Sequence, residues 1–376
     1  METEMDNRGS KSGFYLQSDP VKEQRVDGNW SIAKQNNMLL RCTLMGFERN
    51  YPVKAHTNQW NNRSYSTKQI NPISVNINPW FITGFSEAEG SFIISMYKNE
   101  HSKLKWRVTP NFTINIDIKD IALLQSIKDT FGVGNVRKNS SNTAVYRVDN
   151  IQELQVIVDH FYKYSLIGDK GSDFLLFKQG YDLIKQKQHL IPEGLEKIVA
   201  LNCHLNKGLT DVLMEAFPNI SAIPRPLYKF YGIPDPNWIS GFVSGDSTFC
   251  VSIEKSTNKI GKRVRLIFGT CLQLRDKVLL TGMADYLYKN NRMTGKYIYD
   301  SEDKNRTLLQ IKNFSDIVNI IIPFFNKYPI LGVKSLDFAD FKSVAELMIK
   351  KEHLTSSGLS EIVNIVAKMN VSRTNF

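Results

Sequence analysis

Residues 82–90 read ITGFSEAEG, and residues 239–247 read ISGFVSGDS. In both stretches a glycine, Gly84 or Gly241, lies four residues before another small residue, so the two share one face if the stretch is helical. Glycine destabilises a helix by roughly 1 kcal/mol relative to alanine. Its presence in both stretches therefore predicts two helices whose backbones approach each other closely. The alternative is that each helix packs only against its own sheet.

The stretches belong to a duplicated unit. KYSLIGDKGSDFLLFKQGYDLIKQKQHL begins at Lys163 and KYPILGVKSLDFADFKSVAELMIKKEHL begins at Lys327, so identical residues recur at one offset of 164. Residues 217–238 contain five prolines, which disfavour a helix or a central strand and indicate an extended linker. Two copies joined by a linker imply a pseudo-twofold axis, as in a fused homodimer. We predict an N-terminal, loosely ordered extension (1–75), a first domain (76–217), the linker (218–236) and a second domain (237–376).

Each copy has the same order of elements. A short apolar helix (80–89 or 238–246) precedes a region with strand-like alternation, such as FTINID from Phe112 and VRLIF from Val264. A short helix (120–131 or 276–288), a hairpin and two closing helices follow. The fold class is therefore mixed α/β (α+β), built from two pseudo-symmetric αββαββα repeats with an extra helix in each.

Both glycine-containing helices end in an acid, Glu89 in the first copy and Asp246 in the second. If the helices pack together, the two carboxylates lie side by side and repel each other unless a cation lies between them. Magnesium prefers carboxylate, water and phosphate oxygens, and paired metal ions support phosphodiester hydrolysis. A duplicated acid on a duplicated glycine helix thus predicts a metal-dependent phosphodiester-cleaving site. The alternative for one such acid is a solvated helix end.

The overall composition narrows the class of protein. A net charge of +11 over 376 residues favours a polyanionic partner. The four cysteines and six histidines are dispersed without zinc-ligand spacing, so we expect reduced thiols and no zinc site. The most apolar stretch, residues 317–333, is interrupted by polar residues and proline, so we expect no membrane span. The acidic N-terminus resembles neither a secretory signal nor a transit peptide.

The segments GFSEAEGSF (84–92) and GFVSGDSTF (241–249) resemble the paired LAGLIDADG signatures of homing endonucleases. HLIPEGLEKIV (189–199), LNKGLTDVLMEAFPN (205–219) and IPDPNWISGF (233–242) resemble the single-chain organellar branch of that family. The resemblance runs from about residue 77 to the C-terminus. It implies two sheets forming a saddle over the DNA major groove and cleavage of both strands across the minor groove, at a long, largely asymmetric site. It also implies a monomer that uses Mg²⁺ or Mn²⁺, binds Ca²⁺ without cleavage, and is made in a mitochondrion.

The resemblance also assigns roles to single positions. Glu89 and Asp246 match the metal-binding acids, and the neighbouring metal-ligand positions fall on Ala88 and Gly245. The catalytic lysine of the family falls on two residues, Lys170 and Lys334. For these the sequence leaves a mere surface role equally open. The polar water-positioning residue at the end of the central strand aligns loosely with Asp117 and Gln273.

Two residues of the second copy depart from the family pattern. Ser247 stands where the motif ends in glycine, and a left-handed helix cap at that position would be costly for serine. Ser244 replaces the first acid of the motif. We therefore expect a second half that is less stable or slower, although Asp246 is present.

Basic hairpins recur at equivalent places in both halves, at residues 96–108 and 253–266 and again at residues 135–148 and 288–300. Lysine and arginine can neutralise phosphates or pair with guanine edges. Any single polar hairpin can be merely solvated, but four of them on two sheets favour DNA binding. The candidate DNA-binding residues are Lys98, Lys103, Lys105, Arg107, Arg137, Lys138, Arg147, Lys255, Lys259, Lys262, Arg263, Arg265, Arg292 and Lys296.

Three other functions compete with a DNA endonuclease. An intron RNA maturase would use the same basic surface without needing both acids. A DNA-binding protein with decayed catalysis is favoured by Ser247. A zinc- or histidine-dependent nuclease lacks ligands in the sequence.

Overall fold

The computed structural model describes residues 30–31, 41–42, 77–289, 297–370 and 373. In the N-terminal extension, β1 (Trp30–Ser31) and β2 (Arg41–Cys42) form a short antiparallel pair. The expected loose ordering of residues 1–75 otherwise concerns positions outside the described residues. No described helix has the length and apolar character that a membrane span requires.

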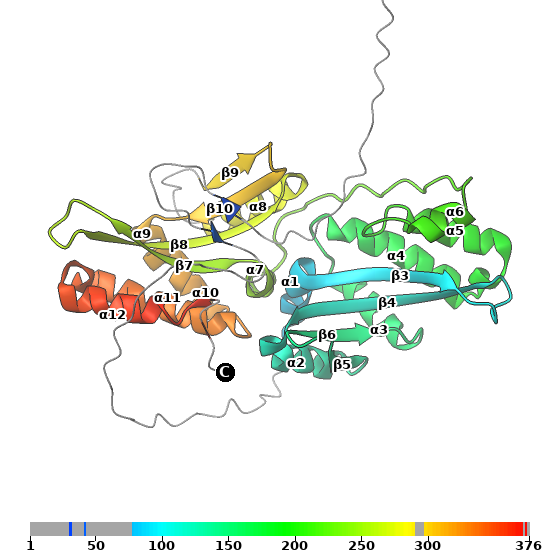
Figure 1. Cartoon of the computed structure of the whole chain (residues 1–376), viewed down its shortest axis with the longest axis horizontal. Coiled ribbons are helices and arrows are strands. Elements are labelled where there is room, and N and C mark those ends of the chain that lie inside the picture. The colour runs from blue at the N-terminus through cyan, green and yellow to red at the C-terminus, as the bar shows by residue number, and fades with distance from the viewer. Residues whose placement is uncertain (1–29, 32–40, 43–76, 290–296, 371–372, 374–376) are drawn as a thin grey trace, which may run out of the picture.

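The two halves repeat one order of elements along the chain, as predicted (Figure 1). The first half comprises α1 (Pro79–Glu89), β3 (Gly90–Lys98), β4 (Trp106–Asp117), η1 (Ile118–Asp120), α2 (Ile121–Phe131), β5 (Asn135–Lys138), β6 (Thr143–Val148), α3 (Glu153–Lys163), α4 (Lys170–Lys185), η2 (Gln188–Leu190), α5 (Pro192–Asn202) and α6 (Asp211–Ala216). The second comprises α7 (Pro236–Gly245), β7 (Thr248–Lys255), β8 (Lys262–Gln273), η3 (Leu274–Asp276), α8 (Lys277–Leu287), β9 (Ile298–Ser301), β10 (Arg306–Ile311), α9 (Phe314–Asp316), the π-helical turn η4 (Ile317–Ile321), α10 (Ile322–Lys327), α11 (Lys334–Ile349), η5 (Glu352–Leu354) and α12 (Ser356–Val366).

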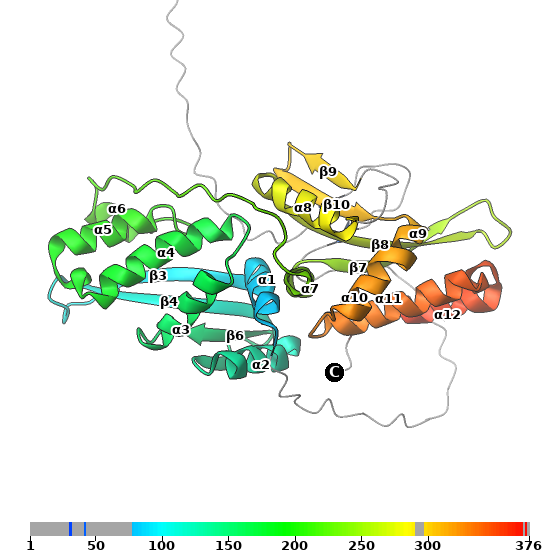
Figure 2. The ribbon, with the colours of Figure 1, turned by 180° about the vertical axis from the view of Figure 1, so that it is seen from behind.

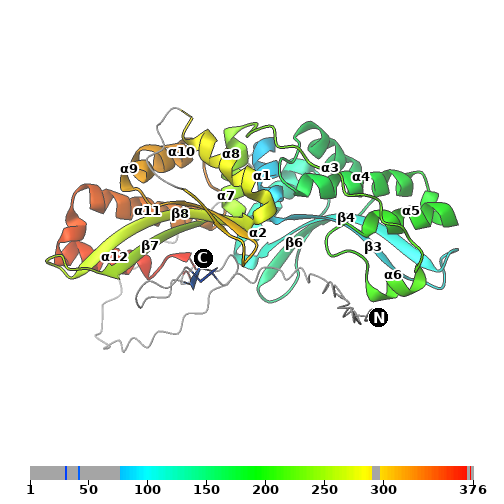
Figure 3. The same cartoon turned by 90° about the horizontal axis from the view of Figure 1, so that it is seen from above.

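Each half contains a four-stranded antiparallel sheet. The strand order is β3-β4-β6-β5 in the first half and β7-β8-β10-β9 in the second, so the topology is duplicated along with the sequence. The helices cover one face of each sheet, and the opposite faces together line an arch (Figure 3). We call these two uncovered faces the concave face. The prediction of two αββαββα repeats is confirmed.

Aromatic side chains fill the core between each sheet and its helices. In the first half, Phe92 on β3 packs against Phe112 on the neighbouring strand and against Phe177 on α4. In the second half, Phe249 makes the same contacts with Phe268 and Phe341. Figure 2 shows the long helices α4 and α11 in front of their sheets, on the face where these contacts are made. Each half therefore has its own core between its sheet and its helices.

The stretch from residue 217 to residue 235 contains no helix or strand, as its prolines predict. It is nevertheless held against the first domain. Arg225 forms ion pairs with Asp169 at 2.8 Å and with Asp173 at 2.5 Å, and the Ser172 hydroxyl donates to the Pro226 carbonyl at 2.7 Å. The connection is thus extended but fixed along the start of α4.

The two glycine helices meet where the halves join. A Cβ atom added to Gly84 would lie 2.0 Å from the Trp238 carbonyl oxygen, and one added to Gly241 would lie 2.0 Å from the Phe81 carbonyl oxygen. Both contacts are with backbone, which cannot rotate away. The predicted close approach of the two helices is therefore confirmed, and packing of each helix only against its own sheet is excluded.

The expected left-handed cap is wrong. Gly90 has an extended conformation with φ −77° and ψ 153°, and Ser247 is not among the described residues with positive φ. Glycine at position 90 instead avoids a clash, because an added Cβ would lie 2.7 Å from the Ser86 carbonyl oxygen. In the second copy α7 already ends at Gly245, and the Ser247 hydroxyl donates to the Val243 carbonyl at 2.7 Å. Serine is therefore accommodated there without a strained backbone.

Candidate active site

The two acids lie at the bottom of the helix seam. Glu89 is the last residue of α1 and Asp246 caps the C-terminal end of α7, and both are partly buried. A Cβ added to Gly245, the residue before Asp246, would lie 3.5 Å from Glu89 Oε1. The Glu89 carboxylate therefore lies next to the backbone at Gly245, the residue that precedes Asp246. The side-by-side placement predicted from the glycine pattern is what the structure has.

The electrostatics of the pair favour an added cation. Burial raises the pKa of Glu89, while the charges of Lys334 and Lys170 oppose the shift. Burial, followed by the negative charge of Glu89, raises the pKa of Asp246 to about 7. Within the described part of the chain, neither carboxylate accepts a hydrogen bond or forms an ion pair within 4.0 Å. Two adjacent carboxylates without donors match the oxygen ligand set of a magnesium ion.

The two predicted lysines flank the acids. Lys170 is the first residue of α4, and its Nζ donates to the Gly90 carbonyl at 2.5 Å. Lys334 is the first residue of α11, and its Nζ donates to the Gly245 carbonyl at 2.6 Å. Burial lowers the pKa of Lys334, although the neighbouring carboxylates oppose this. Each ammonium group is therefore fixed at a carbonyl next to an acid, which a surface role would not require.

The first acid of the motif holds a loop. Glu87 is buried, and its Oε2 accepts from the Ile167 amide at 2.9 Å. At the equivalent place in the second half, Ser244 Oγ accepts from the Leu331 amide at 3.1 Å. Serine thus makes the same contact with the segment before α11 that glutamate makes with the segment before α4. Replacement of the motif's acid by Ser244 therefore preserves the hydrogen bond to this segment. In the first half, burial raises the pKa of Glu87 to about 7.

The candidate water-positioning residues lie at matching strand ends. Asp117 is the last residue of β4 and is exposed, and its Oδ1 accepts from the Lys119 amide at 3.0 Å. Gln273 is the last residue of β8 and pairs in register with Arg306. The residues occupy equivalent positions, but Asp117 also caps the turn that follows it. Their role in positioning water stays a prediction.

The concave face can be assigned from strand alternation, because successive side chains point to opposite faces. In β4, Phe112, Ile114 and Ile116 belong to the core, so the odd-numbered residues line the concave face. The same reasoning applies to β8, where Leu266 and Phe268 are core residues. The predicted DNA-binding residues that fall on this face are Arg107, Arg137, Arg147, Arg263 and Arg265.

The other candidates do not share this position. Four of them lie near the hairpin ends, at strand positions that alternate with the concave-face residues and therefore point to the core side of the sheet: Lys98, Lys138, Lys255 and Lys262. Assignment to the concave face therefore does not extend to these four. Three lie in the hairpin turns, namely Lys103, Lys105 and Lys259, and Lys105 forms an ion pair with Glu100. Arg292 and Lys296 lie outside the described residues.

Sequence reasoning missed several concave-face residues. Tyr97 pairs with Arg107, whose guanidinium lies 5.9 Å from the centre of its ring. Asn115 alternates with Ile114 and Ile116, and its Oδ1 is buried with no hydrogen-bond partner among the residues that the structure describes. Counting alternate residues outward from the core positions would have found both.

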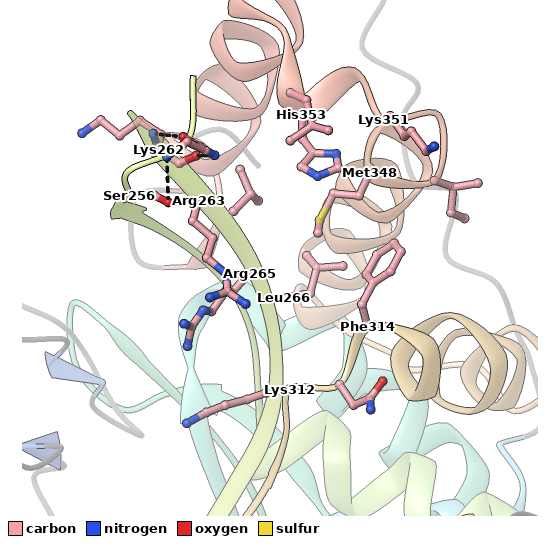
Figure 4. A pocket seen from close by; sticks show the side chains of 15 residues that line it. Ser256, Lys262, Arg263, Arg265, Leu266, Lys312, Phe314, Met348, Lys351 and His353 are labelled. Carbon is pink, nitrogen blue, oxygen red and sulfur yellow. Dashed lines mark hydrogen bonds between the residues drawn. The ribbon is translucent and has the colours of Figure 1, made fainter. Parts of the chain in front are cut away.

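A second missed group lies beside β8. Lys312 follows β10, and its pKa is lowered by burial and then by the positive charge of Arg265. Figure 4 shows both side chains on one side of β8, with Phe314 and Met348 on the other side in a groove of about 1250 Å³. The crowding of Lys312 and Arg265 indicates a concave face built for an anionic partner.

Comparisons with known proteins bear on this arrangement. The family model described as LAGLIDADG endonuclease matches residues 82–181 and 239–345, one match for each half. The chain belongs to the LAGLIDADG endonuclease family. Its two matches in one chain make it a double-motif member. No group of three or more His, Cys, Asp or Glu residues suited to a metal ion occurs among the described residues of this LAGLIDADG protein.

Individual relatives agree with the family. "Probable intron-encoded endonuclease 3" from Neurospora crassa is 38% identical over 375 residues, which cover 96% of this chain and 69% of the relative. The structure of the LAGLIDADG meganuclease I-CpaMI bound to uncleaved DNA is 45% identical with a TM-score of 0.75, and the match covers 78% of this chain and 99% of that one. The LAGLIDADG homing endonuclease I-SmaMI bound to cleaved DNA is 40% identical with a TM-score of 0.75, over 79% and 98% of the two chains.

Proposed function

We propose that this protein is a site-specific homing endonuclease that hydrolyses both strands of double-stranded DNA with divalent metal ions. The observation that carries the proposal is the pair of neighbouring acids, Glu89 and Asp246, each beside a carbonyl that accepts from the first lysine of a long helix. The helices α1 and α7 lie between the two sheets (Figure 3), and the acids stand at the C-terminal ends of these helices. A duplex bound along the concave face would therefore bring its backbone to the acids.

Glu89 and Asp246 would hold the metal ions, and the backbone carbonyls of Ala88 and Gly245 offer further oxygen ligands. Bound Mg²⁺ or Mn²⁺ would supply an activated water and stabilise the leaving oxygen. The lysines next to the acids would supply positive charge where the scissile phosphate gains negative charge. Ca²⁺ is expected to support binding without cleavage. I-SmaMI has been described bound to uncleaved DNA in the presence of calcium ions, which supports this expectation.

The concave face supports a long, largely asymmetric target. Residues at equivalent positions of the central strands differ between the halves: Asn111 corresponds to Ile267, and Asn115 corresponds to Cys271. Asparagine can pair with adenine in the major groove, whereas isoleucine offers only apolar contact. The two halves would therefore read different half-sites, and the chain would act as a monomer.

The setting of the gene is part of the same proposal. Several relatives are named for introns, including "Uncharacterized 50.9 kDa protein in ND4 intron 1" of Podospora anserina, which is 38% identical over 186 residues. "Probable intron-encoded endonuclease Cox1-I1b" of Schizosaccharomyces pombe is 26% identical over 279 residues. These names support a mitochondrial intron as the origin of this protein and the DNA flanking that intron as its target.

The test is cleavage of a plasmid that carries the joined flanking sequence of the gene's own insertion point. We expect linear product with Mg²⁺ or Mn²⁺ and none with Ca²⁺ or EDTA. Glu89→Gln and Asp246→Asn should each abolish linearisation, whereas Glu196→Gln, an exposed control on α5, should not. Tight binding without cleavage in every metal would contradict the proposal and favour a maturase or a catalytically decayed DNA-binding protein.

A further inference from the structure

A second pair of acids lies close to the active site. Asp120 ends η1 and Asp276 ends η3, at equivalent places in the two halves. Each stands at the N-cap position of the following helix, α2 or α8, yet neither side chain caps that helix. Both residues are partly buried, and burial raises the pKa of both carboxyl groups. Their carboxylates must therefore have another use.

Both carboxylates cross to the other domain. Asp120 Oδ1 accepts from the Val333 amide at 2.6 Å, and Val333 is the N-cap residue of α11. Asp276 Oδ1 accepts from the Asp169 amide at 3.3 Å, and Asp169 is the N-cap residue of α4. Neither of these N-cap residues provides a side-chain cap to its own helix. The first turn of each helix is thus capped by an acid of the opposite domain.

The first residue of each capped helix is an active-site lysine. Lys334 follows Val333 and Lys170 follows Asp169, so each interdomain hydrogen bond lies one residue from a lysine whose ammonium group contacts the active site. The amides at a helix start have no intrahelical partner, and a carboxylate there also interacts favourably with the helix dipole. Loss of the contact would free the turn from which the lysine side chain extends.

The backbone next to Lys334 is shaped for this contact. Gly332 has φ +75°, and a Cβ added there would lie 2.4 Å from Asp120 Oδ1. Only glycine permits this conformation without strain and also leaves room for the carboxylate. The segment before α11 is therefore built around the side chain of Asp120.

We propose that Asp120 and Asp276 are positioning residues for DNA cleavage, each holding the lysine of the opposite domain in place. The inference rests on the proposed endonuclease function. It couples assembly of the domain interface to completion of the active site, because a lysine is positioned only when the other domain is docked.

The two contacts hold lysines at different carbonyls, although the charge of Lys334 acts on both acids. Lys334 binds the carbonyl of Gly245, beside Asp246, whereas Lys170 binds the carbonyl of Gly90, beside Glu89. Removing one cap should displace one lysine and leave the other in place. Where each lysine acts mainly at one scissile phosphate, Asp120→Ala and Asp276→Ala should slow opposite strands.

The experiment measures each strand separately in single-turnover cleavage of a duplex labelled on both strands, with Mg²⁺, and measures DNA affinity with Ca²⁺. Each alanine variant should slow one strand by roughly 10- to 100-fold, the cost of a displacement of about 1 Å, and should accumulate nicked DNA. Affinity should stay within about 2-fold of wild type, because neither side chain belongs to the concave face. Asp120→Asn and Asp276→Asn should recover most of the rate, since an amide oxygen can still accept the hydrogen bond.

Matched controls lie further along the same helices. Asp129 on α2 and Asp285 on α8 are exposed, and Asp129→Ala and Asp285→Ala should leave both strands unaffected. Unchanged strand rates in the Asp120 and Asp276 variants, or equal slowing of both strands accompanied by lower thermal stability, would overturn the positioning role. A wild-type protein that binds DNA but cuts neither strand would instead overturn the proposed function, and this role with it.

Discussion

Substitution of Gly84 by alanine tests the helix seam directly. The new Cβ would lie 2.0 Å from the Trp238 carbonyl oxygen and 2.9 Å from the Phe242 amide nitrogen. Ordinary carbon–oxygen contacts are about 3.3 Å, so α1 and α7 must separate by roughly 1.3 Å. Overpacking of this kind costs about 1–3 kcal/mol, and here both sides of the contact are backbone and cannot relax by rotamer changes. Alanine would offset roughly 1 kcal/mol through its higher helix propensity.

We therefore expect Gly84→Ala to lower the free energy of unfolding by about 2 kcal/mol, measured by chemical denaturation. Cleavage should fall by roughly 100-fold even where the protein remains folded, because Glu89 and Asp246 move apart by about 1 Å. Gly241→Ala should behave alike, since its added Cβ meets the Phe81 carbonyl oxygen at the same distance of 2.0 Å.

The control for this experiment is Ser86→Ala on the same helix. Ser86 is buried, and its hydroxyl has no partner among the described residues, so its removal should leave stability unchanged or improved. A Gly84→Ala protein as stable as wild type, or more stable by the gain in helix propensity, would refute the close backbone contact. The acids would then not depend on the seam for their placement.

Three further outcomes follow from the structure. Because the pKa of buried Glu87 is raised from 4.5 to about 7, the folded protein holds a proton that the unfolded chain releases between these values, and stability falls as pH rises through that window. Glu87→Gln should reduce this slope, with a gain in the free energy of unfolding of up to about 3 kcal/mol at pH 8 relative to pH 5; an unchanged slope in denaturation experiments would contradict the shift. Lys334→Met should reduce cleavage by roughly 100-fold or more while calcium-supported DNA binding persists, and equal loss of both would indicate a structural role. DNA affinity should fall by about 1000-fold or more between 50 and 200 mM salt, and a flat response in a binding titration would contradict a phosphate-lined concave face.

Much of the architecture could be predicted because the two halves repeat the same sequence patterns. Glycine at a matching position in both copies predicted the seam, and the acid that follows predicted the paired carboxylates at Glu89 and Asp246. The duplicated Lys170 and Lys334 were identified through resemblance, and the structure places both against carbonyls beside the acids. The seam and the paired acids depend on the spacing of nearby residues, which can be read from the sequence.

Other features depend on contacts between distant residues and could not be predicted. The function of Glu87 and Ser244 became clear only from the amides of Ile167 and Leu331, which are far away in the sequence. The interpretation of Ser247 was wrong because it assumed a left-handed cap, whereas the local constraint is a steric contact with the helix end. A motif position shows that a residue is required there without showing which neighbour requires it.

The two halves have diverged unevenly, and the structure gives a physical reason. A seam residue such as Gly84 contacts the other half, so a change there must suit both halves at once. The same holds for Asp120 and Asp276, because each accepts a hydrogen bond from the other half. In the proposed complex, a concave-face residue such as Asn115 or Cys271 would meet only its own half of a bound duplex. Outer sheet positions can therefore differ between the halves without disturbing the contacts at the axis. Fusion of two copies in one chain permits that difference, because a symmetric homodimer would impose each change on both half-sites.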